Sequence, residues 1–410
     1  MCKDERVRFS ARTAWDLGET PLARALRQRR AAALPILDLT ASNPTQCGFV
    51  YDEAAILAAL GDEAALVYDP DPRGMRQSRE AVCRYYAEHG ARVQPEQVFL
   101  TTGTSEGYGW LFRLLCDAGD EVLIAAPSYP LFDFLAQIED VRLVPYPLVY
   151  DHGWQIDFAG LQERITPRTK AIAVVHPNNP TGHFTKDAER RELERICAEH
   201  DLALVVDEVF LDYSCAAAGP LPGGQKDRAG GRSFAVDQNA CLTFVLSGIS
   251  KVAALPQMKV AWIVVLGPEP ERRESLERLE VVADTFLSMN APVQCALSTW
   301  LDQSEAIQNQ IRRRTQQSLR TLDQVLVQTP VVTRLEIEAG WYAILQVPAL
   351  EKDEELTVRL LEERGVYVHP GSFFGFAGDG WLVLSLLTPR EEFGGGVEAI
   401  CRTFAAPGQV

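Results

Sequence analysis

Short apolar segments alternate with amphipathic segments of helical length through the middle of the chain. The apolar segments are rich in β-branched residues and lie at 97–102, 121–126, 170–176, 202–207, 242–247 and 260–266. Amphipathic stretches separate several of them, among them 105–116 and 186–200. Nearly continuous apolar strands that alternate with helices predict a mostly parallel sheet covered by helices on both faces.

The pattern changes after about residue 290. Residues 294–328 predict one long helix, with Pro292 near its start, where a proline is tolerated in the first turn. Two helices and several strand-like pieces follow, the latter at 331–337, 341–347, 366–369 and 381–387. We therefore expect a large domain over residues 46–285 and a smaller α+β domain over residues 286–410, which residues 1–45 join.

Composition narrows the classes of partner. The 410 residues carry 40 Lys and Arg against 56 Asp and Glu, a formal net charge of −16. Nucleic acids and anionic membranes bind clustered positive charge, so we expect neither as a partner. No apolar run approaches the roughly 18 residues of a membrane span, and we expect a cytoplasmic protein. The nine cysteines form no CxxC pair and the six histidines no ligand spacing, so we expect no metal site.

Three of the predicted strands end in polar strings. The strand at 170–176 runs into HPNNPTG (176–182), the strand at 202–206 into DEVF (207–210), and the strand at 242–246 into SGISK (247–251). Open α/β sheets bind ligands at the carboxyl ends of their strands, so we expect the three strings to meet at one site. No GxGxxG follows a strand and no GxxxxGKS/T occurs, which weakens a dinucleotide-binding or NTPase interpretation.

In this order, and with roughly these separations, the strings resemble those of the class I and II aminotransferases, which are pyridoxal phosphate (PLP) enzymes of fold type I. The resemblance extends from Leu37 to the strand that begins at Trp381. It implies an α/β fold in which the large domain holds a mostly parallel seven-stranded sheet. It also implies transfer of an amino group from an amino acid or amine donor to a keto acceptor, in a homodimer with shared active sites.

The resemblance assigns the central chemistry to three residues. It implies that Lys251 forms the Schiff base with PLP, and lysines with this role lie in partly apolar, water-poor sites. Asp207 corresponds to the carboxylate at the pyridinium nitrogen, which lets the ring act as an electron sink. Asn179 corresponds to the amide that hydrogen-bonds the ring O3′. Taken alone, the three also have ordinary interpretations as a surface lysine, a helix cap and a turn residue before proline.

Other positions match residues that surround the cofactor in this family. Gly103 and Thr104 lie in a turn between a strand and a helix, where backbone N–H groups bind phosphate, although a simple helix cap has the same pattern. Tyr129 matches the aromatic residue that stacks on the ring, and core packing is the alternative. Tyr68 matches the tyrosine that reaches the neighbouring subunit's phosphate, and Ser250 directly precedes the lysine.

Three departures from the family pattern concern the cofactor. Lys259 stands in place of the phosphate arginine, and a lysine remains a good phosphate partner although not a bidentate one. Gly248 stands where the family has serine, with serines at 247 and 250 beside it. Phe210, which we still expect against the cofactor, replaces a tyrosine and lacks the hydroxyl that donates to O3′.

A fourth departure concerns the substrate. Val383 stands where the family has the arginine that grips the donor's α-carboxylate. Another arginine could take this role, and Arg390 is the nearest in sequence, although a solvated charge at a helix end is its ordinary interpretation. Otherwise the donor is an amine or a larger metabolite that is gripped elsewhere, and we favour this second explanation.

The leading hypothesis is therefore a PLP-dependent aminotransferase. One alternative keeps PLP but changes the outcome, to a lyase or cyclase of a modified amino acid. Another is a non-catalytic PLP-binding protein, which is disfavoured because the chain has no appended basic DNA-binding module.

Overall fold

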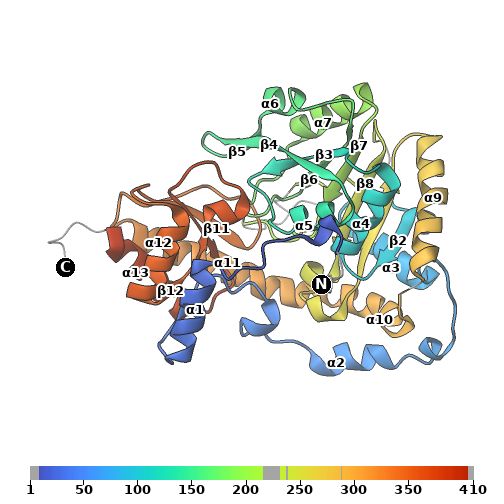
Figure 1. Cartoon of the computed structure of the whole chain (residues 1–410). Coiled ribbons are helices and arrows are strands. Elements are labelled where there is room, and N and C mark those ends of the chain that lie inside the picture. The colour runs from blue at the N-terminus through green and yellow to red at the C-terminus, as the bar shows by residue number, and fades with distance from the viewer. Residues whose placement is uncertain (1–8, 216–230, 237–238, 288, 405–410) are drawn as a thin grey trace, which may run out of the picture.

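The computed structural model describes residues 9–215, 231–236, 239–287 and 289–404 (Figure 1). Its larger sheet has the strand order β2-β9-β8-β7-β6-β3-β4-β5. The strands are β2 (Val98–Thr101), β3 (Glu121–Ala126), β4 (Arg142–Tyr150), β5 (Trp154–Ile156), β6 (Thr169–Val175), β7 (Ala203–Asp207), β8 (Thr243–Gly248) and β9 (Ala261–Leu266). From β8 to β4 every neighbouring pair is parallel, while β9 and β5 run antiparallel to their neighbours.

The central strands are buried on both faces because successive apolar side chains point to opposite sides of the sheet. On β7, for example, Val205 packs with one core and Val206 with the other. Helices α4 (Thr104–Leu115), α5 (Phe132–Ile138) and α9 (Glu271–Phe286) cover one face, and α3 (Arg76–Glu88), α7 (Asp187–Glu199) and α10 (Ala291–Asp302) the other. The predicted mostly parallel, doubly covered sheet is confirmed.

Two strands of this sheet did not follow from the sequence pattern. Pro145 and Pro147 interrupt the apolar run of β4, and much of its surface is exposed near the sheet edge, where proline is tolerated. The short β5 pairs antiparallel with β4 and makes an eighth strand beyond the seven expected.

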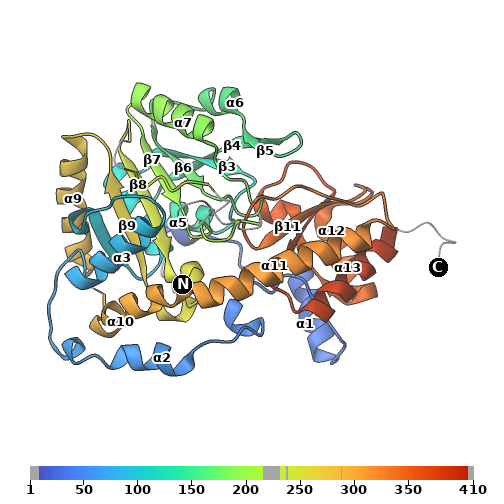
Figure 2. The same cartoon turned by 180° about the vertical axis from the view of Figure 1, so that it is seen from behind.

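The expected single helix over residues 294–328 is wrong in one respect. The structure has two helices, α10 and α11 (Ser304–Leu326), separated at Gln303. They run end to end beneath the larger part of the molecule, which holds the eight-stranded sheet, and the smaller part, which holds the strands after residue 330 (Figure 2). The packing partners change at the break, since α10 lies against α3 of the larger part and α11 against α13 (Arg390–Phe404) of the smaller part.

The smaller part is built on a four-stranded antiparallel sheet with the order β10-β11-β14-β13. Its strands are β10 (Thr333–Arg334), β11 (Tyr342–Gln346), β13 (His369–Pro370) and β14 (Trp381–Ser385). The expected strand over residues 366–369 is divided, because β12 (Val366–Tyr367) pairs with β1 (Leu37–Asp38) and β13 pairs with β14. The N-terminal segment therefore joins this part through β1.

The remaining helical elements are shorter. They are α1 (Pro21–Ala31), α2 (Glu53–Ala58), α6 (Phe158–Gln162), α8 (Ile249–Val252) and α12 (Asp353–Arg359), a π-helical turn at Leu360–Arg364, and the 3₁₀ turns Ala11–Thr13, Pro44–Gln46, Ala59–Gly61, Glu63–Leu66, Pro95–Gln97, Pro256–Met258 and Gly371–Phe374.

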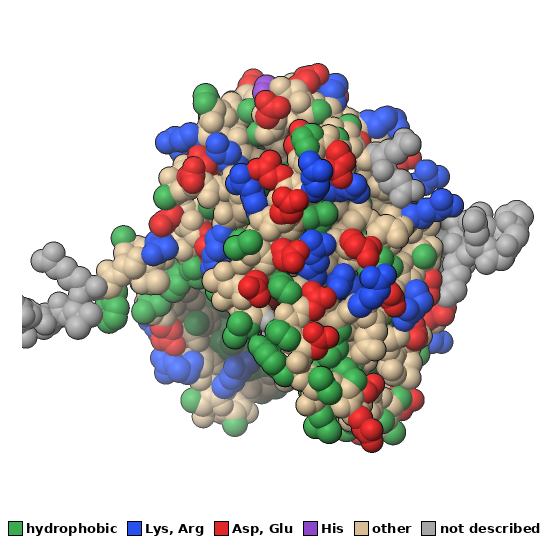
Figure 3. Space-filling model, turned by 90° about the vertical axis from the view of Figure 1, so that its right-hand side faces the viewer, with side chains coloured by type: hydrophobic (Ala, Val, Ile, Leu, Met, Phe, Trp, Pro, Cys, Tyr) green, Lys and Arg blue, Asp and Glu red, His purple; other side chains and the backbone are tan. Residues whose placement is uncertain are grey.

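The surface mixes charges of both signs. Over the side of the larger part where α9 lies, acidic and basic side chains are interspersed, and pairs such as Arg278 with Glu274 connect successive turns (Figure 3). Among the helices of the described residues, none is both long enough and apolar enough to cross a membrane.

Candidate active site

The carboxyl ends of three adjacent parallel strands form the centre of the candidate site. Strands β6, β7 and β8 are neighbours in the sheet, with Val175 in register with Asp207, and Asp207 in register with Leu246. Asp207 ends β7, Gly248 ends β8 just before the helix that carries the lysine, and the NNPTG loop follows β6. The three strings therefore meet at one sheet edge, as the sequence predicts.

Lys251 lies in the single helical turn α8, directly after β8. Its Nζ is 5.1 Å from the centre of the Trp341 ring and 5.7 Å from that of Phe210. Among the described residues, this nitrogen has no hydrogen-bond or ion-pair partner. Burial lowers the pKa of the Lys251 ammonium, and the Asp207 carboxylate only partly opposes that shift. A lysine in this condition is more readily deprotonated and is a better nucleophile.

Asp207 is a buried carboxylate at the floor of the site. Its Oδ1 accepts a hydrogen bond from the Val209 N–H at 3.0 Å. Burial raises the pKa of Asp207 to about 6, and the Val209 N–H, the Tyr108 hydroxyl and the Lys251 charge oppose this rise. A bound cation beside the carboxylate would compensate the cost of burying it.

The turn between β2 and α4 presents hydrogen-bond donors. Gly103 occupies the N-cap position, and the N–H groups of residues 103–105 have no partner among the described residues. A Cβ atom placed on Gly103 would lie 3.9 Å from the Nζ of Lys259, so the lysine points at this turn. Thr104 begins the helix with a partly exposed side chain. Helix N-terminus and lysine together are suited to binding a phosphate.

Asn179 and Tyr129 lie at the rim of the same region. Asn179 is buried, and its Oδ1 has no hydrogen-bond partner within the described part of the chain. The Tyr129 ring packs edge-on against Phe132 at 5.9 Å and is 38% exposed. Burial raises the pKa of Tyr129 to about 12, and the charges of Tyr342 and Asp207 add to this rise.

Two of the other expected cofactor residues lie at the site and one does not. Phe210 is buried and packs edge-on against Trp341 at 5.3 Å. Ser250 is partly buried in α8 beside Lys251. Tyr68 is 78% exposed in the segment before α3, so this chain's own fold does not cover it.

The position of the expected carboxylate arginine is filled by packing. Val383 is the central residue of β14, between Ile344 of β11 and His369 of β13, and is fully buried. Arg390 is exposed at the start of α13. Neither supplies a buried cation at β14.

Three further residues at the site did not follow from the sequence. The Tyr213 hydroxyl donates to the main-chain oxygen of Lys251 at 2.6 Å. Tyr108 approaches Asp207, and Trp341 covers Lys251. The position of Tyr213 could have been suspected from the sequence, because it lies six residues after Asp207 and three after the DEVF string. Trp341 is 90 residues beyond the lysine, and no motif near it points to the site.

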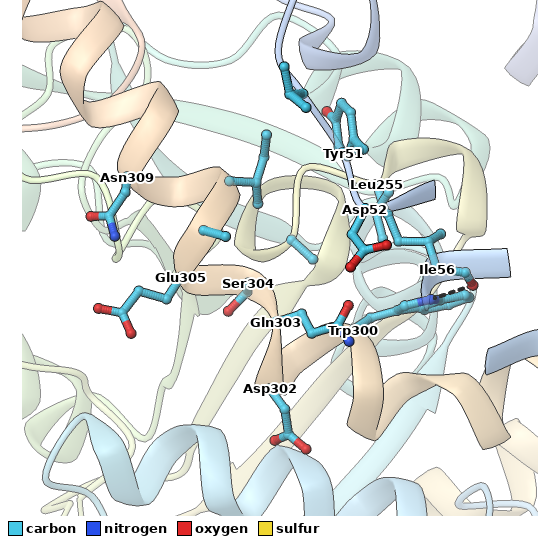
Figure 4. A pocket seen from close by; sticks show the side chains of 14 residues that line it. Tyr51, Asp52, Ile56, Leu255, Trp300, Asp302, Gln303, Ser304, Glu305 and Asn309 are labelled. Carbon is cyan, nitrogen blue, oxygen red and sulfur yellow. Dashed lines mark hydrogen bonds between the residues drawn. The ribbon is translucent and has the colours of Figure 1, made fainter. Parts of the chain in front are cut away.

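A separate hollow of about 530 Å³, which Lys251 does not line, lies at the junction of α10 and α11 (Figure 4). Val50, Tyr51 and Leu255 contribute apolar surface to it, and Asp302 and Glu305 contribute charge. The Trp300 indole N–H closes one side by donating to the Ile56 carbonyl at 3.1 Å. In the described part of the chain no group of three or more His, Cys, Asp or Glu side chains is arranged to hold a metal ion.

Comparisons with known proteins agree with this geometry. The family model described as aminotransferase class I and II matches residues 36–400. An alanine aminotransferase of Mycobacterium tuberculosis is 28% identical over 380 residues, which cover 89% of this chain and 84% of that protein. Glutamate-pyruvate aminotransferase AlaA of Escherichia coli is 26% identical over 288 residues, covering 70% and 68% respectively. The structure of an alanine aminotransferase from Pyrococcus furiosus superposes with a TM-score of 0.84 at 22% identity, covering 97% of this chain and 99% of that one.

Fold and family model together define a PLP-dependent enzyme of fold type I. The chain belongs to the class I and II aminotransferases, whose members use pyridoxal 5′-phosphate, and it is a transaminase.

The residues present fit this cofactor. The N–H groups at the start of α4 lack partners within the described residues, and Lys259 lies beside them, as a phosphate requires. Asp207 is a buried carboxylate suited to a ring nitrogen that carries a proton. Lys251 is a partly buried amine without a hydrogen-bond or ion-pair partner among the described residues, and the Asp207 charge acts on it.

Proposed function

We propose that Lys251 covalently holds PLP and moves the proton during transamination. The observation that carries this proposal is the position of its Nζ, which lies over the Trp341 and Phe210 rings, has no hydrogen-bond or ion-pair partner among the described residues, and is close enough to Asp207 for that carboxylate to affect its pKa. PLP supplies an aldehyde that binds amines and a ring that stabilises negative charge next to the bound nitrogen.

Each residue of the site then has a separate role in the reaction. The carboxylate of Asp207 holds a positive charge on the ring nitrogen. Once the donor's amine has displaced it from the cofactor, the free Nζ of Lys251 would take the proton from the Cα of the donor and return it on the cofactor side. The start of α4 binds the phosphate together with Lys259. The rings of Trp341 and Phe210 lie over the amine and shield it from part of the solvent, and this desolvation lowers the pKa of Lys251 and so favours the neutral form.

Reductive labelling tests this assignment. Borohydride treatment of the PLP-loaded enzyme, followed by peptide mapping, is expected to place the phosphopyridoxyl group on Lys251. Lys251→Ala is expected to carry no label there. A label on one of the other six lysines of the wild-type enzyme, or no label at all, contradicts the proposal.

We further propose that the donor's carboxylate is not gripped from β14. Val383 is apolar and fully buried, and a desolvated carboxylate without a partner is costly. The relatives have alanine, glutamate and pyruvate in their names, and these all carry an α-carboxylate, so the proposal departs from them. The donor class that suits the site is an amine or a larger metabolite held elsewhere.

A donor panel tests the proposed class. We expect slow amino transfer to the cofactor from alanine, aspartate, glutamate and aromatic amino acids. The change in visible absorbance measures the rate of this transfer. Arg390→Ala is expected to leave these rates unchanged, because Arg390 is exposed at the start of α13. Fast transfer from any of these donors that Arg390→Ala abolishes assigns the carboxylate to Arg390 instead.

A homodimer with shared sites is also proposed. Apolar side chains stand exposed along the segment that precedes α3 and beside the hollow of Figure 4: Val50, Leu57, Leu66, Val67 and Tyr68. Exposed apolar surface of this extent favours a covering partner, and a second copy of the chain would bring Tyr68 to a neighbouring phosphate. The cytoplasmic location and the domain boundaries at residues 45 and 285 remain predictions.

A further inference from the structure

A charged cluster outside the proposed catalytic machinery connects the two parts of the molecule. The imidazole of His183 is buried, with Nε2 3.0 Å from Oε2 of Glu189 and Nδ1 3.5 Å from Oε2 of Glu338. These are ion-pair contacts, since neither ring nitrogen makes a hydrogen bond of ordinary geometry to the described residues. Glu189 belongs to α7 of the larger part, whereas Glu338 belongs to the loop before β11 of the smaller part. Lys186 forms a further ion pair with Glu338.

The two loops that this cluster joins both lead to the site. His183 lies four residues after Asn179, and Glu338 lies three residues before Trp341. A hydrogen bond joins the same two loops, because the main-chain N–H of Phe184 donates to Oε2 of Glu338 at 3.0 Å. The cluster is therefore in a position to decide where Trp341 lies against Lys251.

The charges around the ring favour its protonated form. Burial lowers the pKa of His183, but the two carboxylates outweigh it, so the net shift is upward. Glu338 responds in the opposite sense, since His183 and Lys186 lower its pKa to about 2 against the effect of burial. The nearby His176 is buried with its pKa lowered to about 3 and stays neutral. In the described part of the chain, the cations Arg190 of α7 and Lys186 also act on the His176 ring.

We propose that His183 is a positioning residue, whose imidazolium bridges Glu189 and Glu338 and thereby holds Trp341 over Lys251. The proposal rests on the assignment of Lys251 made above. Without the bridge, the loop before β11 loses its charged contact with α7. Trp341 then covers the lysine less completely, water reaches the amine, and its protonated form becomes more favoured.

The rate at which the apoenzyme captures added PLP, followed by visible absorbance across a pH series, measures the protonation of Lys251. We expect His183→Asn to slow capture several-fold near neutral pH and to move the pH midpoint of the rate upward. His200→Asn is the matched control, because His200 is exposed at the end of α7 and is expected to leave the profile unchanged. Glu338→Gln keeps an acceptor for the Phe184 N–H but loses the charge, and is expected to repeat the effect.

The NMR signals of the imidazole rings provide an independent readout. The chain has six histidines, and the signal that disappears in His183→Asn is the signal of His183. This signal is expected to titrate above pH 6.5, the ordinary value for histidine. Titration at or below that value, or an unchanged capture profile in Glu338→Gln, overturns the positioning role. Absence of label on Lys251 in the wild-type enzyme would instead overturn the proposed function, so the two failures are distinguishable. If His183→Asn does not fold, Glu338→Gln and the wild-type titration decide.

Discussion

Adjacent buried carboxylates serve different purposes in this protein. Asp207 faces the region of Lys251, while Glu208, the next residue, points to the opposite side of the strand end. There it accepts hydrogen bonds from the Ser233 hydroxyl at 2.7 Å and from the Phe234 N–H at 2.5 Å. Alternation along an extended chain separates the two groups, so one is available for chemistry and the other anchors residues 233–234.

Glu208 predicts a pH dependence of stability. Burial raises its pKa to about 7 from an ordinary value of 4.5, so the folded state binds the proton more tightly than the unfolded state. Stability from this group is full at low pH and is lost as pH rises through about 7, by an amount on the order of 3 kcal/mol. Glu208→Gln is expected to flatten the dependence of the unfolding free energy on pH, as measured by urea denaturation. The exposed control Glu163→Gln is expected to keep the wild-type slope, and an equal slope in both variants contradicts the assignment.

The position of Lys259 predicts that its removal weakens binding of the cofactor. Its Nζ points at the turn before α4, but the residue is exposed, so its contribution belongs at the low end for a charged hydrogen bond. Lys259→Ala is expected to weaken PLP binding by about 1.5 kcal/mol, or roughly tenfold in the dissociation constant. Lys259→Arg is expected to retain the affinity, and Lys352→Ala, at an exposed lysine before α12, serves as the control. Wild-type affinity in Lys259→Ala would show that the amine points elsewhere.

At the scale of elements, the strands were predictable and their interruptions were not. The runs that form β2, β3 and β6 to β9 are apolar in the middle, with polar residues mainly at their ends, and this pattern is local. The break at Gln303 depends on which neighbour each helix packs against, and so does the division between β12 and β13. Packing partners are distant in sequence, so no local pattern marks these boundaries.

The loop after β6 approaches the loop before β11 closely, and this predicts that a side chain at Gly182 is not tolerated. Gly182 has φ +70°, and a Cβ there would lie 2.3 Å from the Ala339 carbonyl oxygen. Gly90 has φ +75° with open space around it, so Gly90→Ala measures the cost of the left-handed backbone alone, about 1–2 kcal/mol. Gly182→Ala is expected to lose more stability than Gly90→Ala in thermal unfolding and also to slow PLP capture, because it displaces the loop before Trp341. Equal losses in both variants would contradict the close approach of the two loops.

At the scale of the whole molecule, the site lies where the larger and the smaller part meet. The larger part supplies Lys251 and Asp207, and the smaller part supplies Trp341. Tyr68 is presented outward. A complete site therefore requires the two sheets to be held in a defined relation, and we propose that a second chain completes it.

Mixed dimers test the shared site. Lys251→Ala lacks the amine but keeps Tyr68, and Tyr68→Ala has the reverse defect. After unfolding and refolding together in equal amounts, the mixture is expected to recover about a quarter of the wild-type site activity, because half of the dimers are hybrids with one intact site. Each variant refolded alone is the control. Recovery no greater than the average of the two controls would mean that Tyr68 serves its own chain or neither.

The candidate site was partly predictable for a chemical reason. Asp207, Asn179 and Lys251 follow apolar strands directly, and parallel strands bring their carboxyl ends to one edge whatever the details of packing. Trp341 and Tyr213 also face the lysine, but the first reaches it from another sheet and the second through its hydroxyl alone. Such contacts depend on how two layers are docked.

By itself, the sequence determined the sheet, the covering helices and the edge at which polar strings gather, because periodicity and strand direction are local or nearly local properties. It also determined that Val383 and Phe210 lack the groups that the family pattern contains at those positions. Only the tertiary structure decided that Trp341 lies over Lys251, that Lys259 points at the α4 turn, and that His183 lies between two carboxylates. These contacts join residues that are far apart in the chain or belong to different elements, and those of Trp341 and Glu338 form only when the two parts of the molecule pack together.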